Sequence, residues 1–294
     1  MGKAYIKGSW TIMWLHVEIS SRCNAWCPGC GRNKSGYGLA DNLVEQDLDP
    51  AILKSTLEKY SVTEVQMCGN LGDPCAAKNI DDHLKIVADS SVVRLQIHTN
   101  GSLRKPEWWA NLVKQFEHLE QFDVYFALDG LADTHSIYRQ GTSYARVIEN
   151  ATAFIDAGGN ATWQFIPFKH NEHQIKDCLK LSQDLGFKKF EFLKNARYQK
   201  MPDSKHYQTG ELLGIQPWSR DKLGDNKYHL NKTPTKVDKQ DCMHLQIPSL
   251  FLNATGKISP CCYMGNTVQY TDVDIETEFN NNNYRNVCLT SCGK

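Results

Sequence analysis

Six short apolar runs are spaced along the first two thirds of the chain, and a loop follows each of them. The runs cover residues 13–19, 64–68, 93–98, 123–128, 161–167 and 188–193. They are rich in β-branched and aromatic residues, and runs of this length and composition predict β-strands.

Between these runs, apolar residues recur at helical spacing. The first expected helix begins at Asp49-Pro50, an N-cap residue followed by proline at the first helical position. Further helices are expected over about 77–89, from Pro106 onward, over about 143–157 and over about 172–185.

Strands that alternate with helices at this spacing predict a parallel sheet with helices outside it. The expected fold class is α/β, a partial (β/α)6 barrel of the TIM type over residues 11–195. The carboxyl ends of its strands should meet at one mouth. Residues 196–241 are polar and are interpreted as a connecting segment. Residues 242–294 are expected to form a small cysteine-rich domain.

Composition limits the compartment and the partners. Lys plus Arg and Asp plus Glu each number 33, so no overall charge favours nucleic acid. Residues 1–7 lack a signal-peptide apolar core, and no apolar run is long enough to span a membrane. The clustered cysteines among the 11 are therefore expected to bind metal in a reducing cytoplasm, where disulfides are rare, whereas Cys68, Cys75 and Cys178 have no ligand spacing.

Three of these cysteines stand close together after the first strand. Cys23, Cys27 and Cys30 have the spacing C-x3-C-x2-C. Three thiolates can hold three irons of a four-iron cluster and leave one iron open for a cofactor. The alternative is zinc, but structural zinc usually has four ligands in paired hooks.

The triplet resembles that of the radical S-adenosylmethionine (SAM) enzymes, and three further segments at strand ends support the resemblance. The segment from Gly69 to Pro74 is similar to the family's glycine-rich loop, Thr99-Asn100-Gly101 to its T-N-G, and Ala127 to Arg139 to its S-L-D-G…H…R pattern. The resemblance implies cofactor-binding roles for Gly69, Asn70, Gly72, Asp73, Pro74, Thr99, Asn100, Asp129 and Arg139.

The sequence departs from this family at two positions. Ala127 replaces the serine of the third pattern, and Gly29 stands where an aromatic residue usually precedes the third cysteine. Trp26 is the candidate to supply the missing aromatic packing near adenine. His16 and His98, in strands one and three, are interpreted as structural or solvating.

A second group of cysteines resembles the auxiliary-cluster unit of these enzymes, called SPASM or twitch. Cys242, Cys261, Cys288 and Cys292 are the expected ligands of one auxiliary [4Fe-4S] cluster, and Cys262 is left open as a replacement. An Asn/Gly hairpin over about 250–258 should present Cys261. A zinc site with four cysteine ligands fits this spacing equally well.

The resemblance implies reductive cleavage of SAM at a [4Fe-4S] cluster, which yields a 5′-deoxyadenosyl radical that modifies a substrate. It implies a peptide or a small molecule as substrate, by oxidation or crosslinking, and an electron donor such as flavodoxin or ferredoxin. Dehydrogenation of a sugar or polyol, as in twitch enzymes, is an alternative. A zinc-binding interaction protein on a degenerate barrel is the alternative from another class.

Overall fold

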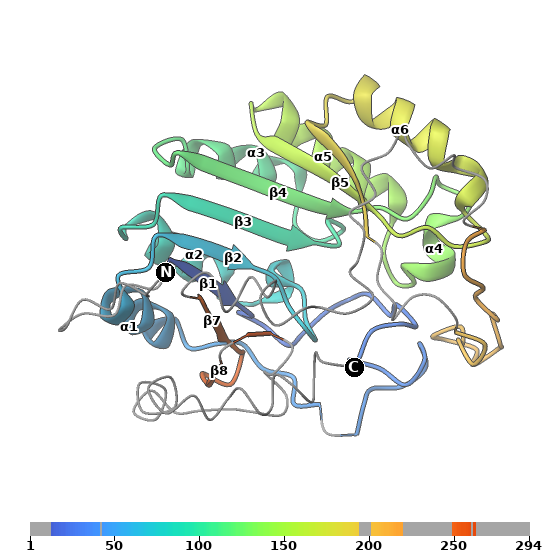
Figure 1. Ribbon diagram of the computed structural model, residues 1–294, viewed down its shortest axis with the longest axis horizontal. Helices are drawn as coiled ribbons and strands as arrows, with labels where there is room; N and C mark the ends of the chain where they lie inside the picture. The colour runs from blue at the N-terminus through green and yellow to red at the C-terminus, as the bar shows by residue number, and fades with distance from the viewer. Residues whose placement is uncertain (1–12, 42, 194–200, 220–248, 260, 263–294) are drawn as a thin grey trace, which may run out of the picture.

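The computed structural model describes residues 13–41, 43–193, 201–219, 249–259 and 261–262. Its centre is one twisted sheet in the order β6-β5-β4-β3-β2-β1-β7-β8 (Figure 1). The strands are β1 Trp14–Val17, β2 Glu64–Met67, β3 Arg94–Thr99, β4 Gln121–Ala127, β5 Asn160–Phe165, β6 Lys189–Phe192, β7 Ser249–Leu252 and β8 Ile258–Ser259.

Neighbouring strands from β1 to β6 all pair in parallel, so the expected open barrel is confirmed. The intervening helices are α1 Pro50–Tyr60, α2 Ile80–Ala88, α3 Pro106–Gln115, α4 His135–Tyr138, α5 Tyr144–Asp156 and α6 Ile175–Asp184. Two 3₁₀ turns, η1 Pro74–Ala76 and η2 Glu172–Gln174, follow β2 and β5. No sequence pattern predicted α4 or η1.

Local sequence explains where α1 begins. The side chain of Asp49 accepts a hydrogen bond from the backbone N–H of Ala51, and Pro50 occupies the first turn. Along the strands, side chains alternate between the two faces of the sheet. Leu15, Val65 and Leu95 are each at most 1% exposed and belong to one large core with the apolar residues of the helices.

The opposite face of the same strands is polar. His16 pairs in register with Gln66, and Gln66 with Gln96. A sheet with one apolar and one polar face requires helices on one side and leaves the other side for a binding cavity.

The expected hairpin near residues 250–258 is confirmed, because β7 and β8 pair antiparallel. Its place was not expected: β7 lies parallel to β1, with Leu15 opposite Leu250, and extends the barrel sheet. The proposed boundary of a separate cysteine-rich domain depends on residues outside those described and stays a prediction.

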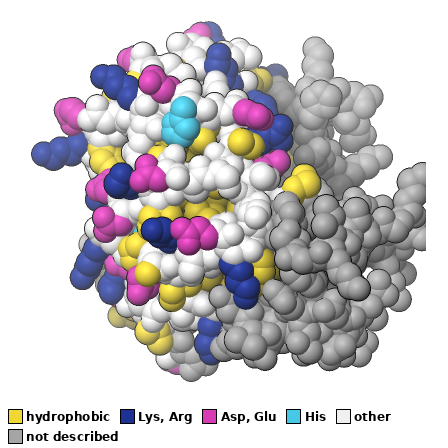
Figure 2. Space-filling view, turned by 90° about the vertical axis from the view of Figure 1, so that its left-hand side faces the viewer, with side chains coloured by type: hydrophobic (Ala, Val, Ile, Leu, Met, Phe, Trp, Pro, Cys, Tyr) yellow, Lys and Arg dark blue, Asp and Glu magenta, His cyan; other side chains and the backbone are white. Residues whose placement is uncertain are grey.

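Acidic and basic side chains are interspersed over the described part of the face in Figure 2. No helix among the described residues is both long and apolar enough to cross a membrane.

Candidate active site

A cavity of about 530 Å³ lies at the carboxyl ends of the barrel strands. Its wall includes most of the residues that the sequence singled out: Cys23, Cys27, Cys30, Gly69, Asn70, Gly72, Asp73, Thr99, Asn100 and Arg139. Residues scattered over more than 100 positions therefore meet in one place, because parallel strands bring their carboxyl ends to the same edge.

The three cysteines lie in the segment that follows β1, and residues 21–41 of it are here called the cysteine loop. Each sulfur receives an N–H donor. Ala25 N lies 3.3 Å from Cys23 Sγ, Arg139 Nη1 lies 3.8 Å from Cys27 Sγ, and Arg32 N lies 3.5 Å from Cys30 Sγ. Asn100 Nδ2 also donates to Cys23 Sγ at 3.7 Å. Such N–H···S contacts stabilise thiolate ligands and tune iron–sulfur clusters.

Burial raises the pKa of the Cys23 thiol well above its ordinary value, and the nearby Asp73 carboxylate raises it further. Burial raises the pKa of Cys27 to about 11, although the Arg139 guanidinium opposes the shift. Without a bound cation these thiols keep their protons at neutral pH, so metal binding releases protons.

All three thiols border the cavity. Within residues 13–41, 43–193, 201–219, 249–259 and 261–262, no three His, Cys, Asp or Glu side chains are grouped as ligands of a single ion. The thiolates of a four-iron cluster bind separate irons, and three thiols on one cavity wall fit that donor set.

The glycine-rich loop after β2 closely approaches Ser20, the residue before the cysteine loop. A Cβ on Gly72 would lie 1.9 Å from Ser20 O, so only glycine fits there. Glu18, which the sequence analysis missed, accepts hydrogen bonds from Leu71 N at 2.6 Å and Gly72 N at 3.1 Å. Glu18 is 3% exposed, and a carboxylate at the end of an apolar strand was the signal for it.

Asp73 joins the glycine-rich loop to the end of β3. Its carboxylate accepts hydrogen bonds from Thr99 Oγ1 at 2.9 Å, Asn100 N at 2.7 Å and Cys75 N at 2.9 Å. Burial raises the pKa of Asp73, and these donors oppose the rise. Pro74 is buried at the start of η1 and does not belong to the cavity wall.

Asp129 and Arg139 form a buried ion pair, with Arg139 Nε 2.6 Å from Asp129 Oδ2. The other carboxylate oxygen of Asp129 accepts from Ile166 N at 2.6 Å. Burial raises the pKa of Asp129, and Arg139 is the main influence that lowers it. Asp129 is completely buried and absent from the cavity wall, so its geometry is that of a residue that positions Arg139.

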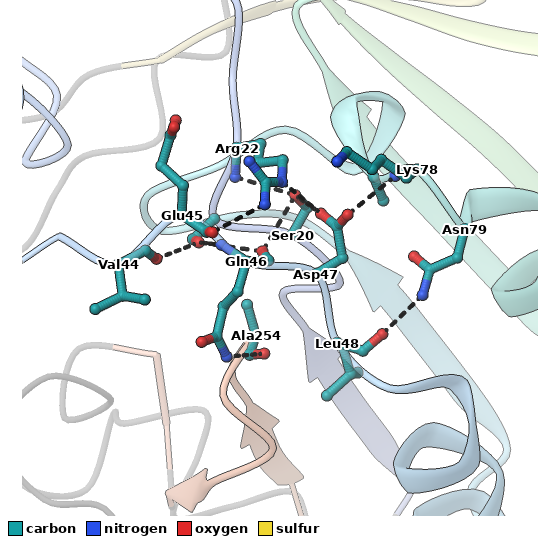
Figure 3. A network of polar contacts seen from close by, with 12 residues as sticks. Ser20, Arg22, Val44, Glu45, Gln46, Asp47, Leu48, Lys78, Asn79 and Ala254 are labelled. Atoms are coloured by element: carbon teal, nitrogen blue, oxygen red, sulfur yellow. Dashed lines mark hydrogen bonds and ion pairs between the residues drawn. The ribbon is translucent and has the colours of Figure 1, made fainter.

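The start of the cysteine loop is fixed by a polar network (Figure 3). Ser20 Oγ donates to Asp47 Oδ1 at 2.6 Å, and Arg22 Nε lies 3.5 Å from the same oxygen. Gln46 Nε2 donates to Ala254 O at 2.7 Å. The network therefore connects the loop after β1 to the hairpin of β7 and β8.

Trp26 does not border the cavity; its ring stacks on Tyr207, with centroids 6.1 Å apart. Gly29 lines the wall itself. The packing of Trp26 near adenine therefore stays a prediction.

Two cysteines that are neighbours in sequence, at the end of the hairpin, have different surroundings. Cys261 is buried and lies outside the cavity wall, whereas Cys262 lines it, and Asn70 Nδ2 donates to Cys262 O at 2.8 Å. Cys242, Cys288 and Cys292 lie outside the described residues, so the four-cysteine auxiliary site stays a prediction.

Three polar residues on the inner sheet face also border the cavity: His16, His98 and Gln164. Gln164 Nε2 donates to Glu191 Oε2 at 3.0 Å. This bond orients the amide of Gln164 so that its Oε1 lies 3.4 Å from His98 Nδ1. Burial lowers the pKa of His98 to about 4, so the ring is neutral at neutral pH. No sequence motif indicated Gln164.

The sequence profile of the Radical SAM superfamily matches residues 17–188. The chain belongs to this superfamily. The family supports SAM and a [4Fe-4S] cluster as cofactors, and the cavity wall contains the thiols that such a cluster requires.

Similar structures have the same fold. Streptococcus suis SuiB bound to S-adenosylmethionine aligns with a TM-score of 0.60 at 14% identity, over 90% of this chain and 63% of that one. SuiB bound to the precursor peptide SuiA aligns with a TM-score of 0.59 at 15% identity, over 90% and 62% of the two chains.

One curated relative is the 7,8-dihydro-6-hydroxymethylpterin dimethyltransferase of Methanocaldococcus jannaschii. It is 22% identical over 144 residues, which is 48% of this chain and 28% of that protein. This chain therefore matches less than a third of that relative's length.

Proposed function

We propose that the chain binds a [4Fe-4S] cluster through Cys23, Cys27 and Cys30 and modifies a peptide substrate by a SAM-dependent radical reaction. The observation that carries the proposal is that these three sulfurs line one cavity and each receives an N–H donor. When bound, the cluster supplies the electron for reductive cleavage of SAM.

The chain's own residues provide binding and orientation. Arg139 is held by Asp129 at the cavity wall, and a guanidinium there suits the carboxylate of SAM. The backbone of the loop from Gly69 to Asp73 borders the same space and suits the methionyl ammonium group. Asp73, whose oxygens already accept three donors, orders this loop and the end of β3.

The proposed peptide substrate is supported by the fold shared with SuiB, which has been crystallised with a precursor peptide. We propose oxidation or crosslinking as the outcome, with Cys242, Cys261, Cys288 and Cys292 holding an auxiliary cluster. A flavodoxin or ferredoxin is the proposed reductant and the cytoplasm the proposed compartment. Dehydrogenation of a sugar or polyol is the small-molecule alternative.

Methyl transfer is a second candidate, favoured by the similarity to the pterin dimethyltransferase. Mass spectrometry distinguishes methyl transfer from oxidation or crosslinking after anaerobic incubation with SAM, reductant and the peptides encoded beside the gene. Loss of hydrogen from a peptide supports oxidation or crosslinking, and gain of a methyl group supports the second candidate.

The cofactor assignment is tested by metal analysis of protein purified without oxygen. Two clusters give about eight irons per chain and one cluster gives about four. Cys27→Ala should lose the N-terminal cluster and all SAM cleavage. Cys178→Ala is the matched control, because Cys178 is a completely buried thiol of α6 outside the cavity wall. Zinc without sulfide, or undiminished 5′-deoxyadenosine formation by Cys27→Ala, contradicts the assignment.

A further inference from the structure

Part of the polar connecting segment packs against the cysteine loop. Residues 201–217, here called the strap, fold back on themselves through the antiparallel bridges Met201–Ile215 and Lys205–Leu212. Phe168, after β5, forms a third bridge to Pro217. The strap is thus attached to the barrel at one end.

Gln140 joins the strap to the cysteine loop. Its side-chain Nε2 donates to Lys205 O at 2.9 Å, and its Oε1 accepts from Tyr207 N at 2.8 Å. Its backbone oxygen accepts from Trp26 N at 2.8 Å. Gln140 is 2% exposed, so water does not replace these bonds when they break.

Other contacts support the same junction. Lys205 N donates to Ser35 O at 2.8 Å, and Trp26 stacks on Tyr207 at an interplanar angle of 21°. A Cβ on Gly36 would lie 2.5 Å from Lys205 O, so the close approach of the two backbones requires glycine there.

A small hydrophobic cluster crosses the junction as well. It contains Ala25 and Cys27 from the cysteine loop, Tyr138 from α4 and Ile215 from the strap. Gln140 follows Arg139 directly, and Arg139 donates to Cys27 Sγ. Two consecutive residues therefore contact the cysteine loop. Arg139 does so at the Cys27 sulfur, and Gln140, whose side chain binds the strap, does so at Trp26 N.

We propose that Gln140 is a positioning residue that uses the strap to hold the cysteine loop in the conformation that presents its three thiols to the cavity. This inference rests on the proposed cluster. Gln140 is not itself a residue of the cavity wall, so it acts on the cluster through the loop that it fixes. The strap itself lies in a segment that the sequence describes only as polar.

The matched control is Gln174, another buried glutamine whose amide joins loop segments outside the cysteine loop. It is 5% exposed, accepts from Leu131 N at 3.0 Å and donates to Asp133 Oδ1 at 2.8 Å. Gln140→Ala and Gln174→Ala should therefore lower the melting temperature by similar amounts, and only the first should affect the cysteine loop.

The first measurement is the rate at which an iron chelator bleaches the anaerobic holoprotein. The phase that belongs to the N-terminal cluster is the one that Cys27→Ala lacks. In Gln140→Ala this phase should be about tenfold faster, which corresponds to about 1.4 kcal/mol of lost loop stability. In Gln174→Ala it should be unchanged. Equal rates in the two variants overturn the proposal.

The second measurement does not need a cluster. Amide hydrogen exchange of cluster-free protein should increase over residues 21–41 in Gln140→Ala and stay at the wild-type level there in Gln174→Ala. Unchanged exchange over 21–41 in Gln140→Ala overturns the proposal even if a cluster binds. Increased exchange in a protein that takes up no iron retains the positioning role and refutes the proposed function instead.

Discussion

Removing the charge of Asp129 tests how much the buried ion pair contributes to the free energy of unfolding. Asp129→Asn keeps the shape of the side chain and an oxygen that accepts from Ile166 N, but removes the negative charge that lies 2.6 Å from Arg139 Nε. The Asp129 side chain is 0% exposed and that of Arg139 is 14% exposed, so water compensates little. Loss of one partner of such a pair lowers the free energy of unfolding by about 3 kcal/mol. The melting temperature then falls by about 6 °C.

The assay is urea unfolding of the cluster-free protein, followed by circular dichroism, because a bound cluster breaks two-state behaviour. Glu64→Gln is the control. Glu64 pairs with Arg94 at 3.1 Å, but these side chains are 31% and 48% exposed, so its loss should cost less than about 1 kcal/mol.

A double-mutant cycle with Arg139→Met completes this test. The double variant should be at least about 2 kcal/mol more stable than the sum of the single losses predicts, because both charges of the pair are removed together. If Asp129→Asn costs no more than Glu64→Gln, or if the two losses simply add, the buried pair does not have the assigned role.

Three more predictions concern the same region. Burial lowers the pKa of His135 to about 3, below its unfolded value of about 6.5, so its contribution to stability is complete above about pH 6.5 and is lost as the pH falls toward 3. Urea titrations should show about 1.4 kcal/mol lost per pH unit from this residue, and His135→Asn should remove that part of the slope. Gly72→Ala forces a Cβ against Ser20 O and should cost about 3 kcal/mol, whereas Gly31→Ala, which meets only a side-chain carbon at 3.7 Å, should melt near the wild type. Glu18→Ala frees two buried N–H groups of the glycine-rich loop and should weaken SAM binding at least about tenfold by calorimetry; unchanged affinity contradicts its role in shaping that loop.

Much of the site was predictable from local patterns. Apolar runs and helical spacing located six strands, and the motif residues follow those strands. Because parallel strands end at one edge, Cys23, Asp73, Asn100 and Arg139 could be expected at one cavity before any contact was known.

Individual roles needed the folded chain. Asp129 belongs to the same motif as Arg139, yet one is completely buried and the other borders the cavity. Trp26 stands among the cysteines but stacks on Tyr207. Sequence spacing gives the face of an element on which a residue lies, and packing determines what that face meets.

The sequence alone determined the βα order and the chemistry of the first cysteine loop, since both follow from short-range patterns of polarity and residue type. Only the tertiary structure placed β7 beside β1, brought Asn70 to Cys262 across 192 positions and set the strap against Gln140. These contacts join segments far apart in the chain. Their partners are selected by shape and hydrogen bonding in the folded state, which no local pattern records.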